Sequence, residues 1–109
     1  MEKMGMCIYL DKLKVKEYKK LHKNCPNTIR QLLKNVHVHN FSIFLKEPEN
    51  ILFSYWEYSG NNFEKDMKTM ADNGDNKAWW KLCGPCQKPF PTRKKGEWWA
   101  SMENVFYNK

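Results

Sequence analysis

The sequence of 109 residues lacks any long apolar run. No stretch approaches the roughly 20 apolar residues that a membrane-spanning helix needs, and residues 1–5 carry no basic region followed by an apolar one. We therefore expect a cytoplasmic protein with no membrane partner. Internal repeats and low-complexity segments are also absent, and 41% of the residues are hydrophobic, too many for a disordered chain. A chain of this length buries one core, so we expect a single domain over residues 1–109.

Arginine is scarce, although the formal net charge is +7. An excess of cations favours nucleic acid as a partner, because cations on a protein release counterions from phosphates. Here, however, the only arginines are Arg30 and Arg93, and the lysines are spread among aspartates and glutamates. Dispersed lysine is more typical of a solvated surface than of a surface that follows a phosphate backbone. We therefore expect no nucleic-acid partner.

A second pair of cysteines with metal-binding spacing is missing. Cys83 and Cys86 have the two-residue gap of a zinc knuckle, but Cys7 and Cys25 stand alone. A thioredoxin-like redox pair normally opens a helix after a strand, whereas this pair closes a helical pattern. We therefore expect free thiols in a reducing compartment and no metal.

The pattern of apolar residues divides the chain into strands and helices. Strict alternation predicts strands over residues 4–10, 39–45, 51–58 and 102–107. Apolar positions at helical spacing run over residues 13–22, 29–36, 63–71 and 79–86. Asp11 is a plausible helix cap, Pro26 separates the first two helices, and Asn73 with Gly74 interrupts the later pair.

The order strand, helix, strand, strand, helix, strand predicts a ferredoxin-like α+β fold, in which helices cover one face of an antiparallel sheet. The composition of residues 47–50 predicts a tight turn, so the two strands around it form a hairpin. Large apolar residues occupy both faces of these strands, for example Phe53 on one face and Trp56 on the other. The second face therefore needs a cover as well. A homodimer would supply it, and we expect a dimeric α+β barrel.

Tyr18 and His22 are the residues from which chemistry can be argued. They lie four apart on a predicted helix, so they share a face. Imidazole titrates near neutral pH and suits proton transfer at the anomeric centre of a sugar. Tyrosine and histidine at this spacing are also common packing residues whose polar ends lie in water, and the pattern alone favours that interpretation. Because His22 falls near the end of its helix, we expect the helix dipole to favour its protonated form.

Several short motifs follow one another along the chain: Tyr18 with His22, His39-Asn40-Phe41, Ala78-Trp79-Trp80-Lys81, Pro85-Cys86-Gln87-Lys88-Pro89, and the segment from Gly96 to Phe106. Taken in order, these motifs resemble the L-rhamnose mutarotase family. The resemblance covers essentially the whole chain, and it implies a small cytoplasmic homodimer of the α+β barrel type. It further implies an isomerase that interconverts the α and β anomers of a deoxyhexose, with a monosaccharide as its small-molecule partner and without cofactor or metal.

The resemblance also implies roles for individual residues. His22 is expected to be the proton donor and Tyr18 a substrate-binding hydroxyl, while Trp79 and Trp80 line the sugar pocket. On pattern alone, Trp79 fits core packing equally well. Phe41 stands at a substrate-binding position where the bacterial rhamnose enzymes have tyrosine, so this chain lacks one hydroxyl and the identity of the sugar stays open.

Two questions are left open by the sequence. The base that works with His22 can be Tyr18, a bound water or a carboxylate such as Asp72. The alternative function is a non-catalytic or differently catalytic dimeric α+β barrel that binds a small ligand in the same aromatic cavity, because fold alone does not settle function.

Overall fold

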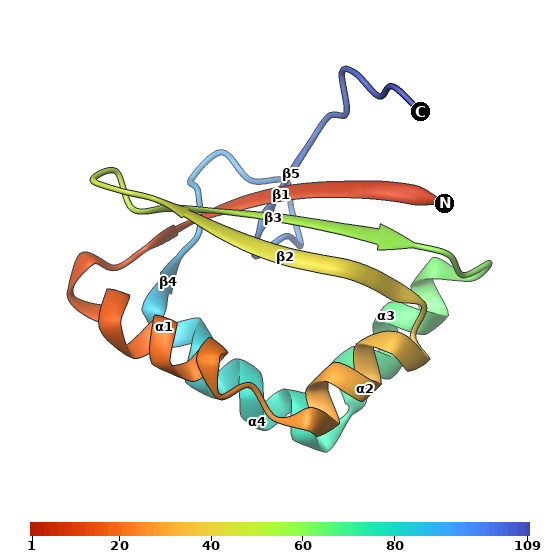
Figure 1. The fold of residues 1–109 in the computed structure, drawn as a ribbon, viewed down its shortest axis with the longest axis horizontal. Coiled ribbons are helices and arrows are strands. Elements are labelled where there is room, and N and C mark those ends of the chain that lie inside the picture. The colour runs from red at the N-terminus through yellow and green to blue at the C-terminus, as the bar shows by residue number, and fades with distance from the viewer.

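A curled antiparallel sheet organises the computed structural model, which describes residues 1–109 (Figure 1). The strand order is β2-β3-β1-β4, with β5 also paired to β1. This is the ferredoxin-like order, so the predicted fold class is confirmed. The strands are β1 (Glu2–Leu10), β2 (Val38–Lys46), β3 (Ile51–Tyr58), and the short β4 (Gln87–Lys88) and β5 (Ala100–Met102).

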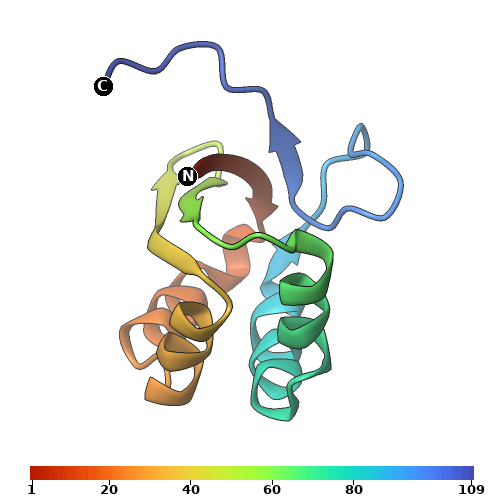
Figure 2. The ribbon, with the colours of Figure 1, turned by 90° about the vertical axis from the view of Figure 1, so that its right-hand side faces the viewer.

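All the α-helices lie on one face of this sheet, in two arms (Figure 2). One arm holds α1 (Val15–Lys23) and α2 (Asn27–Asn35), and the other holds α3 (Phe63–Asp72) and α4 (Gly74–Cys83). Short 3-10 turns precede α1 (Lys12–Lys14) and follow α4 (Gly84–Cys86). No helix combines the length and the hydropathy that crossing a lipid bilayer requires.

The predicted helix signals are found where the sequence placed them. Asp11 caps the first turn by accepting a hydrogen bond from the Leu13 N–H at 2.9 Å. Pro26, with extended backbone angles, separates α1 from α2. Asn73 separates α3 from α4 in the same way and caps the second of them through the Asn76 N–H at 2.9 Å.

The inner face of the sheet and the helices enclose two apolar clusters. Ile8 of β1 pairs with Leu52 of β3, so both side chains point towards the helices. They belong to the first cluster, which packs β1 and β3 against α1 and α4, and the second cluster packs β3 against α2. Complete burial of one such aliphatic side chain stabilises the fold by about 1.5–3 kcal/mol. The buried members of the first cluster are Ile8, Leu10, Tyr18, Leu52, Cys83 and Cys86.

A bulge in β2 changes which residues face the helices. Simple alternation puts His39 and Phe41 on the same face, and this prediction is wrong. The register between β2 and β3 shifts between His39 and Ser42, with Asn40 in the left-handed region at φ 52°. One extra residue reverses the side on which the following side chains lie. Phe41 therefore lies on the inner face, where its ring is stacked with that of Trp56 at 6.4 Å between centroids.

The C-terminal segment also differs from the prediction. The expected strand over residues 102–107 is wrong, because only Ala100–Met102 pairs with β1. Residues 103–109 have no regular secondary structure and lead away from the sheet on the side opposite the helices (Figures 1 and 2). Alternation shows that a segment suits a strand, but a strand also needs a neighbour that supplies hydrogen bonds. No strand of this chain pairs with residues 103–107, and Val105 is 86% exposed.

Candidate active site

Tyr18, His22 and Trp79 form one aromatic cluster between helices α1 and α4. The rings of Tyr18 and His22 lie one helical turn apart with centroids 4.2 Å apart and an angle of 33° between their planes. The His22 and Trp79 rings approach edge to face at 5.2 Å. Tyr18 is buried in the first apolar cluster, whereas His22 and Trp79 are half-buried. The fold therefore brings together a phenol, an imidazole and an indole face.

The backbone fixes the tautomer of His22. Its Nδ1 lies 3.0 Å from the carbonyl oxygen of Tyr18. A carbonyl oxygen only accepts hydrogen bonds, so Nδ1 carries a proton and donates it to this bond. In the neutral imidazole the lone pair is then on Nε2. This nitrogen can take a proton and afterwards return it.

Burial lowers the pKa of His22, and the hydrogen bond to the Tyr18 carbonyl only partly opposes this effect. The expectation that the helix end holds His22 protonated is therefore wrong. The dipole of a helix of nine residues acts weakly near the surface, whereas packing against Tyr18 and Trp79 removes the water that would solvate the cation. The neutral ring is the resting form at neutral pH.

Gln87 is the partner of the Tyr18 hydroxyl. Its Nε2 donates to the Tyr18 Oη at 3.0 Å, and its Oε1 accepts from the Trp98 Nε1–H at 2.8 Å. Burial raises the pKa of Tyr18, although the hydrogen bond from Gln87 opposes the rise. Sequence reasoning gave Gln87 and Trp98 no role, although both lie in motifs that carry the family resemblance. A glutamine in a two-residue strand has no periodicity that would single it out.

Phe41 and Trp80 are placed differently from this cluster. Phe41 is 42% exposed on the inner face of the sheet, and its ring contacts that of Trp56. Trp80 is 47% exposed on α4, one residue beyond Trp79 and turned about 100° from it around the helix. Asp72, one candidate base, has an exposed carboxylate that pairs with Lys68 at 2.9 Å.

The buried cysteines beside the cluster are poor nucleophiles. The four cysteines are free, and Cys86 donates its S–H to the Glu17 carboxylate at 3.0 Å. Burial raises the pKa of Cys83 to about 12 and that of Cys86 to about 11. Because the thiolate is the reactive form, these thiols pack the core and do not react readily.

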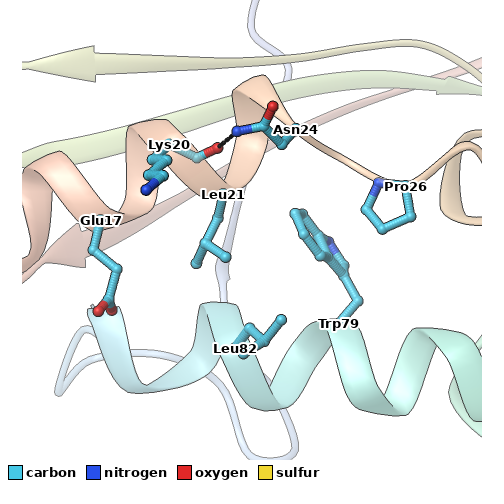
Figure 3. Close-up of a pocket in the computed structure, with 7 residues that line it drawn as sticks. All are labelled: Glu17, Lys20, Leu21, Asn24, Pro26, Trp79 and Leu82. Atoms are coloured by element: carbon cyan, nitrogen blue, oxygen red, sulfur yellow. Dashed lines mark hydrogen bonds between the residues drawn. The ribbon is translucent and has the colours of Figure 1, made fainter.

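A groove to which Trp79 contributes lies between α1 and α4 (Figure 3). Its volume is about 280 Å³. Neither Tyr18 nor His22 lines it, so the groove is separate from the proton-transfer groups and Trp79 is the residue common to both. The lining residues are Glu17, Lys20, Leu21, Asn24, Pro26, Trp79 and Leu82.

Comparisons with known proteins agree on one family. The family model described as L-rhamnose mutarotase matches residues 3–108. The L-rhamnose mutarotase of Formosa agariphila is 30% identical over 107 residues, which cover 98% of each chain. That of Oceanobacillus iheyensis is 37% identical over 84 residues, covering 76% of this chain and 75% of the relative.

Solved structures agree in fold. The crystal structure of the L-rhamnose mutarotase from Formosa agariphila matches with a TM-score of 0.79 at 28% identity, over 100% of both chains. A putative antibiotic biosynthesis monooxygenase from Caulobacter crescentus matches with a TM-score of 0.56 at 12% identity over 78% of this chain and 76% of that one, a likeness of fold only. The family model, the sequence relatives and the structural match together show that this chain belongs to the L-rhamnose mutarotase family.

Proposed function

We propose that this chain is a mutarotase that interconverts the α and β anomers of L-rhamnose or a closely related deoxyhexose. The observation that carries the proposal is the arrangement of His22, whose Nδ1 is held by the Tyr18 carbonyl while its Nε2 is left for proton transfer. Tyr18 and Trp79 lie against the same ring. Membership of a family whose curated relatives are L-rhamnose mutarotases supports this substrate.

The reaction needs one acid and one base. The anomeric hydroxyl loses its proton, the bond from the anomeric carbon to the ring oxygen breaks, and the ring oxygen gains a proton. Rotation about the bond between the first two carbons of the open aldehyde, followed by closure, gives the other anomer. Proton transfers accompany the breaking and re-forming of this C–O bond and no oxidation or reduction occurs, so the proposed chemistry uses no cofactor or metal.

His22 suits both halves of this reaction. Its neutral form accepts the proton of the anomeric hydroxyl at Nε2, and the resulting imidazolium is then the proton donor that the family resemblance implies. General acid–base help of this kind is worth about 10²–10⁴ in rate. Among the candidate partners of His22, a bound water fits better than Tyr18, because burial raises the pKa of that phenol. It also fits better than Asp72, whose carboxylate pairs with Lys68.

The aromatic side chains suit a 6-deoxy sugar. Its methyl group and axial C–H groups are apolar and pack well on indole faces. Trp79 offers such a face directly beside His22. We assign Trp80, from the same helix, and Phe41, from the inner face of the sheet, to the same sugar pocket, as the family resemblance implies. Phe41 supplies apolar contact and no hydroxyl.

We also propose a homodimer formed through the outer face of the sheet, in the cytoplasm. Phe44 is 60% exposed there, and its ring lies 6.2 Å from that of Phe53. The register puts Tyr9 and Met102 on the same face, and both are more than a third exposed. An apolar surface of this kind favours association. Four free cysteines support a reducing compartment.

Saturation-transfer NMR on L-rhamnose tests the activity directly. Irradiation of one anomeric proton should reduce the signal of the other when micromolar enzyme is present. An exchange rate equal to the uncatalysed rate would refute the activity for that sugar. If other deoxyhexoses and common hexoses were also unaffected, a small-ligand-binding protein would replace the mutarotase as the interpretation.

A further inference from the structure

A chain of two hydrogen bonds leads from Trp98 through Gln87 to the Tyr18 hydroxyl. The Trp98 Nε1–H donates to the Gln87 Oε1 at 2.8 Å. The Gln87 Nε2 in turn donates to the Tyr18 Oη at 3.0 Å. Strand β4 holds Gln87 in place, because residues 87 and 88 pair with Leu10 and Tyr9 of β1. The amide is therefore anchored at its backbone and at both ends of its side chain.

The orientation of the Gln87 amide follows from the chemistry of its neighbour. The indole nitrogen of tryptophan donates and cannot accept, so the amide oxygen has to face Trp98. The amide NH₂ then has to face Tyr18. A hydroxyl that accepts a hydrogen bond from Gln87 cannot direct its own proton along the same line, so the Tyr18 O–H points elsewhere.

The Tyr18 O–H has no acceptor within the chain. The only hydrogen bond made by its oxygen is the one accepted from Gln87. Buried hydroxyl donors generally find a partner, since leaving one unpaired is costly. A sugar bound beside His22 would bring oxygen atoms to this position. This step rests on the proposed function, in which the sugar lies against Tyr18 and His22.

We propose that Gln87, held by Trp98, is a positioning residue that makes Tyr18 a hydrogen-bond donor to an oxygen atom of the sugar. Gln87 acts through Tyr18 and need not touch the substrate itself. Burial raises the pKa of Tyr18, so the hydroxyl keeps the proton that it donates throughout the neutral range. Trp98 is at the outer end of this chain of hydrogen bonds and is 48% exposed, so it tolerates substitution.

The test compares KM and kcat for anomer exchange in a set of variants. Gln87→Met keeps the approximate volume but removes the amide donor, and KM for L-rhamnose should rise about 2- to 10-fold, the value of one hydrogen bond. Gln87→Glu should raise KM further, because a carboxylate accepts the Tyr18 proton and withdraws it from the sugar. Trp98→Phe should give a smaller rise in KM, because the side-chain amide of Gln87 can then rotate and exchange the positions of its oxygen and nitrogen.

A double substitution separates positioning from a general structural role. If Gln87 acts through the Tyr18 hydroxyl, Gln87→Met should have no further effect on KM in a Tyr18→Phe background. An equal rise in KM in both backgrounds would overturn the proposal, as would wild-type KM in Gln87→Glu. Circular dichroism shows whether each variant is folded, and Trp98→Phe provides the test if a Gln87 variant is not.

The outcome also separates this proposal from the proposed function. An active wild-type enzyme with unaffected Gln87 and Trp98 variants would overturn the positioning role alone. A wild-type protein that neither exchanges the anomers nor binds deoxyhexoses would overturn the proposed function and this role with it.

Discussion

The Nδ1 of His22 lies 3.0 Å from the carbonyl oxygen of Tyr18, so a single turn of helix α1 fixes the tautomer of the proposed catalytic imidazole. The bond uses the residue four positions earlier, and this spacing also places the two rings, tilted by 33°, with their centroids 4.2 Å apart. This hydrogen bond orients the imidazole, whereas packing against Tyr18 and Trp79 removes its water. The lowered pKa of His22 therefore comes from burial, which the hydrogen bond only partly opposes.

Replacement of His22 should remove catalysis but not the fold. His22→Gln keeps much of the side-chain volume, and we expect anomer exchange to fall about 10²- to 10⁴-fold. Saturation-transfer NMR measures the exchange rate, and urea unfolding shows that the variant is folded. Lys16→Gln, an exposed substitution on the same helix, is the matched control and should exchange at the wild-type rate. Retained exchange in His22→Gln would take this residue out of the mechanism.

The lowered pKa of His22 makes stability depend on pH. Below its ordinary value of 6.5, the unfolded chain binds a proton at His22 that the folded chain does not yet bind. The free energy of unfolding should therefore decrease as pH falls through this range, and the loss should stop below the folded-state pKa. Urea unfolding from pH 8 to pH 5 should show a smaller loss in His22→Gln than in the wild type. Equal losses would contradict the lowered pKa.

The two adjacent tryptophans should differ in their effect on stability. Trp79 packs against the first apolar cluster, so Trp79→Ala should cost about 3 kcal/mol of unfolding free energy, the low end for a buried tryptophan because it is partly exposed. Trp80→Ala should cost about 1 kcal/mol or less, as expected at a half-exposed site. Urea unfolding measures both. If Trp80 lines the sugar pocket, Trp80→Ala should still raise KM; an unchanged KM would remove it from the site.

Phe41→Tyr should improve binding of L-rhamnose. The site is 42% exposed, so the added hydroxyl fits with a change in unfolding free energy of about 0.5 kcal/mol or less. One new hydrogen bond to the sugar should lower KM about 2- to 10-fold. Phe44→Tyr adds the same group on the outer face and should leave KM unchanged. An increased KM for L-rhamnose in Phe41→Tyr would contradict this expectation and would show that the sugar prefers an apolar side chain at this position.

The outer face of the sheet should form the interface between the two subunits of the proposed homodimer. Phe44→Lys introduces a charge into the proposed dimer interface and should convert the dimer to a monomer, as measured by sedimentation velocity. Leu13→Lys adds the same charge at a position that is 83% exposed near the start of the first helical arm. This control should remain dimeric. A Phe44→Lys variant that stays dimeric would place the interface elsewhere.

Local signals were sufficient wherever short-range contacts decide the structure. The cap at Asp11, the break at Pro26 and the interruption at Asn73 are all present. Each depends on hydrogen bonds or steric limits within a few residues, so the sequence contains the whole cause. The pairing of β2 with β3 could be predicted for the same reason, because a short turn joins the two strands.

The sequence predictions failed where contacts with residues distant along the chain determine the structure. Phe41 lies on the inner face, and not on the face of His39, because the pairing of β2 with β3 contains a bulge that alternation within β2 does not reveal. Residues 103–107 alternate well but find no strand to pair with. The helix dipole at His22 is a local effect, and packing against Trp79 from another helix outweighs it.

The sequence by itself determined the order of the elements, the fold class and the helical spacing that puts Tyr18 beside His22, because periodicity, caps and turns act over a few residues. Only the tertiary structure decided the environment of that pair. Trp79 reaches it from α4, and Gln87 reaches it from β4 with Trp98 behind it. The lowered pKa of His22 depends on burial. The orientation of the Tyr18 hydroxyl depends on a hydrogen bond from Gln87, 69 positions away along the chain, and such a contact forms only when the chain has folded.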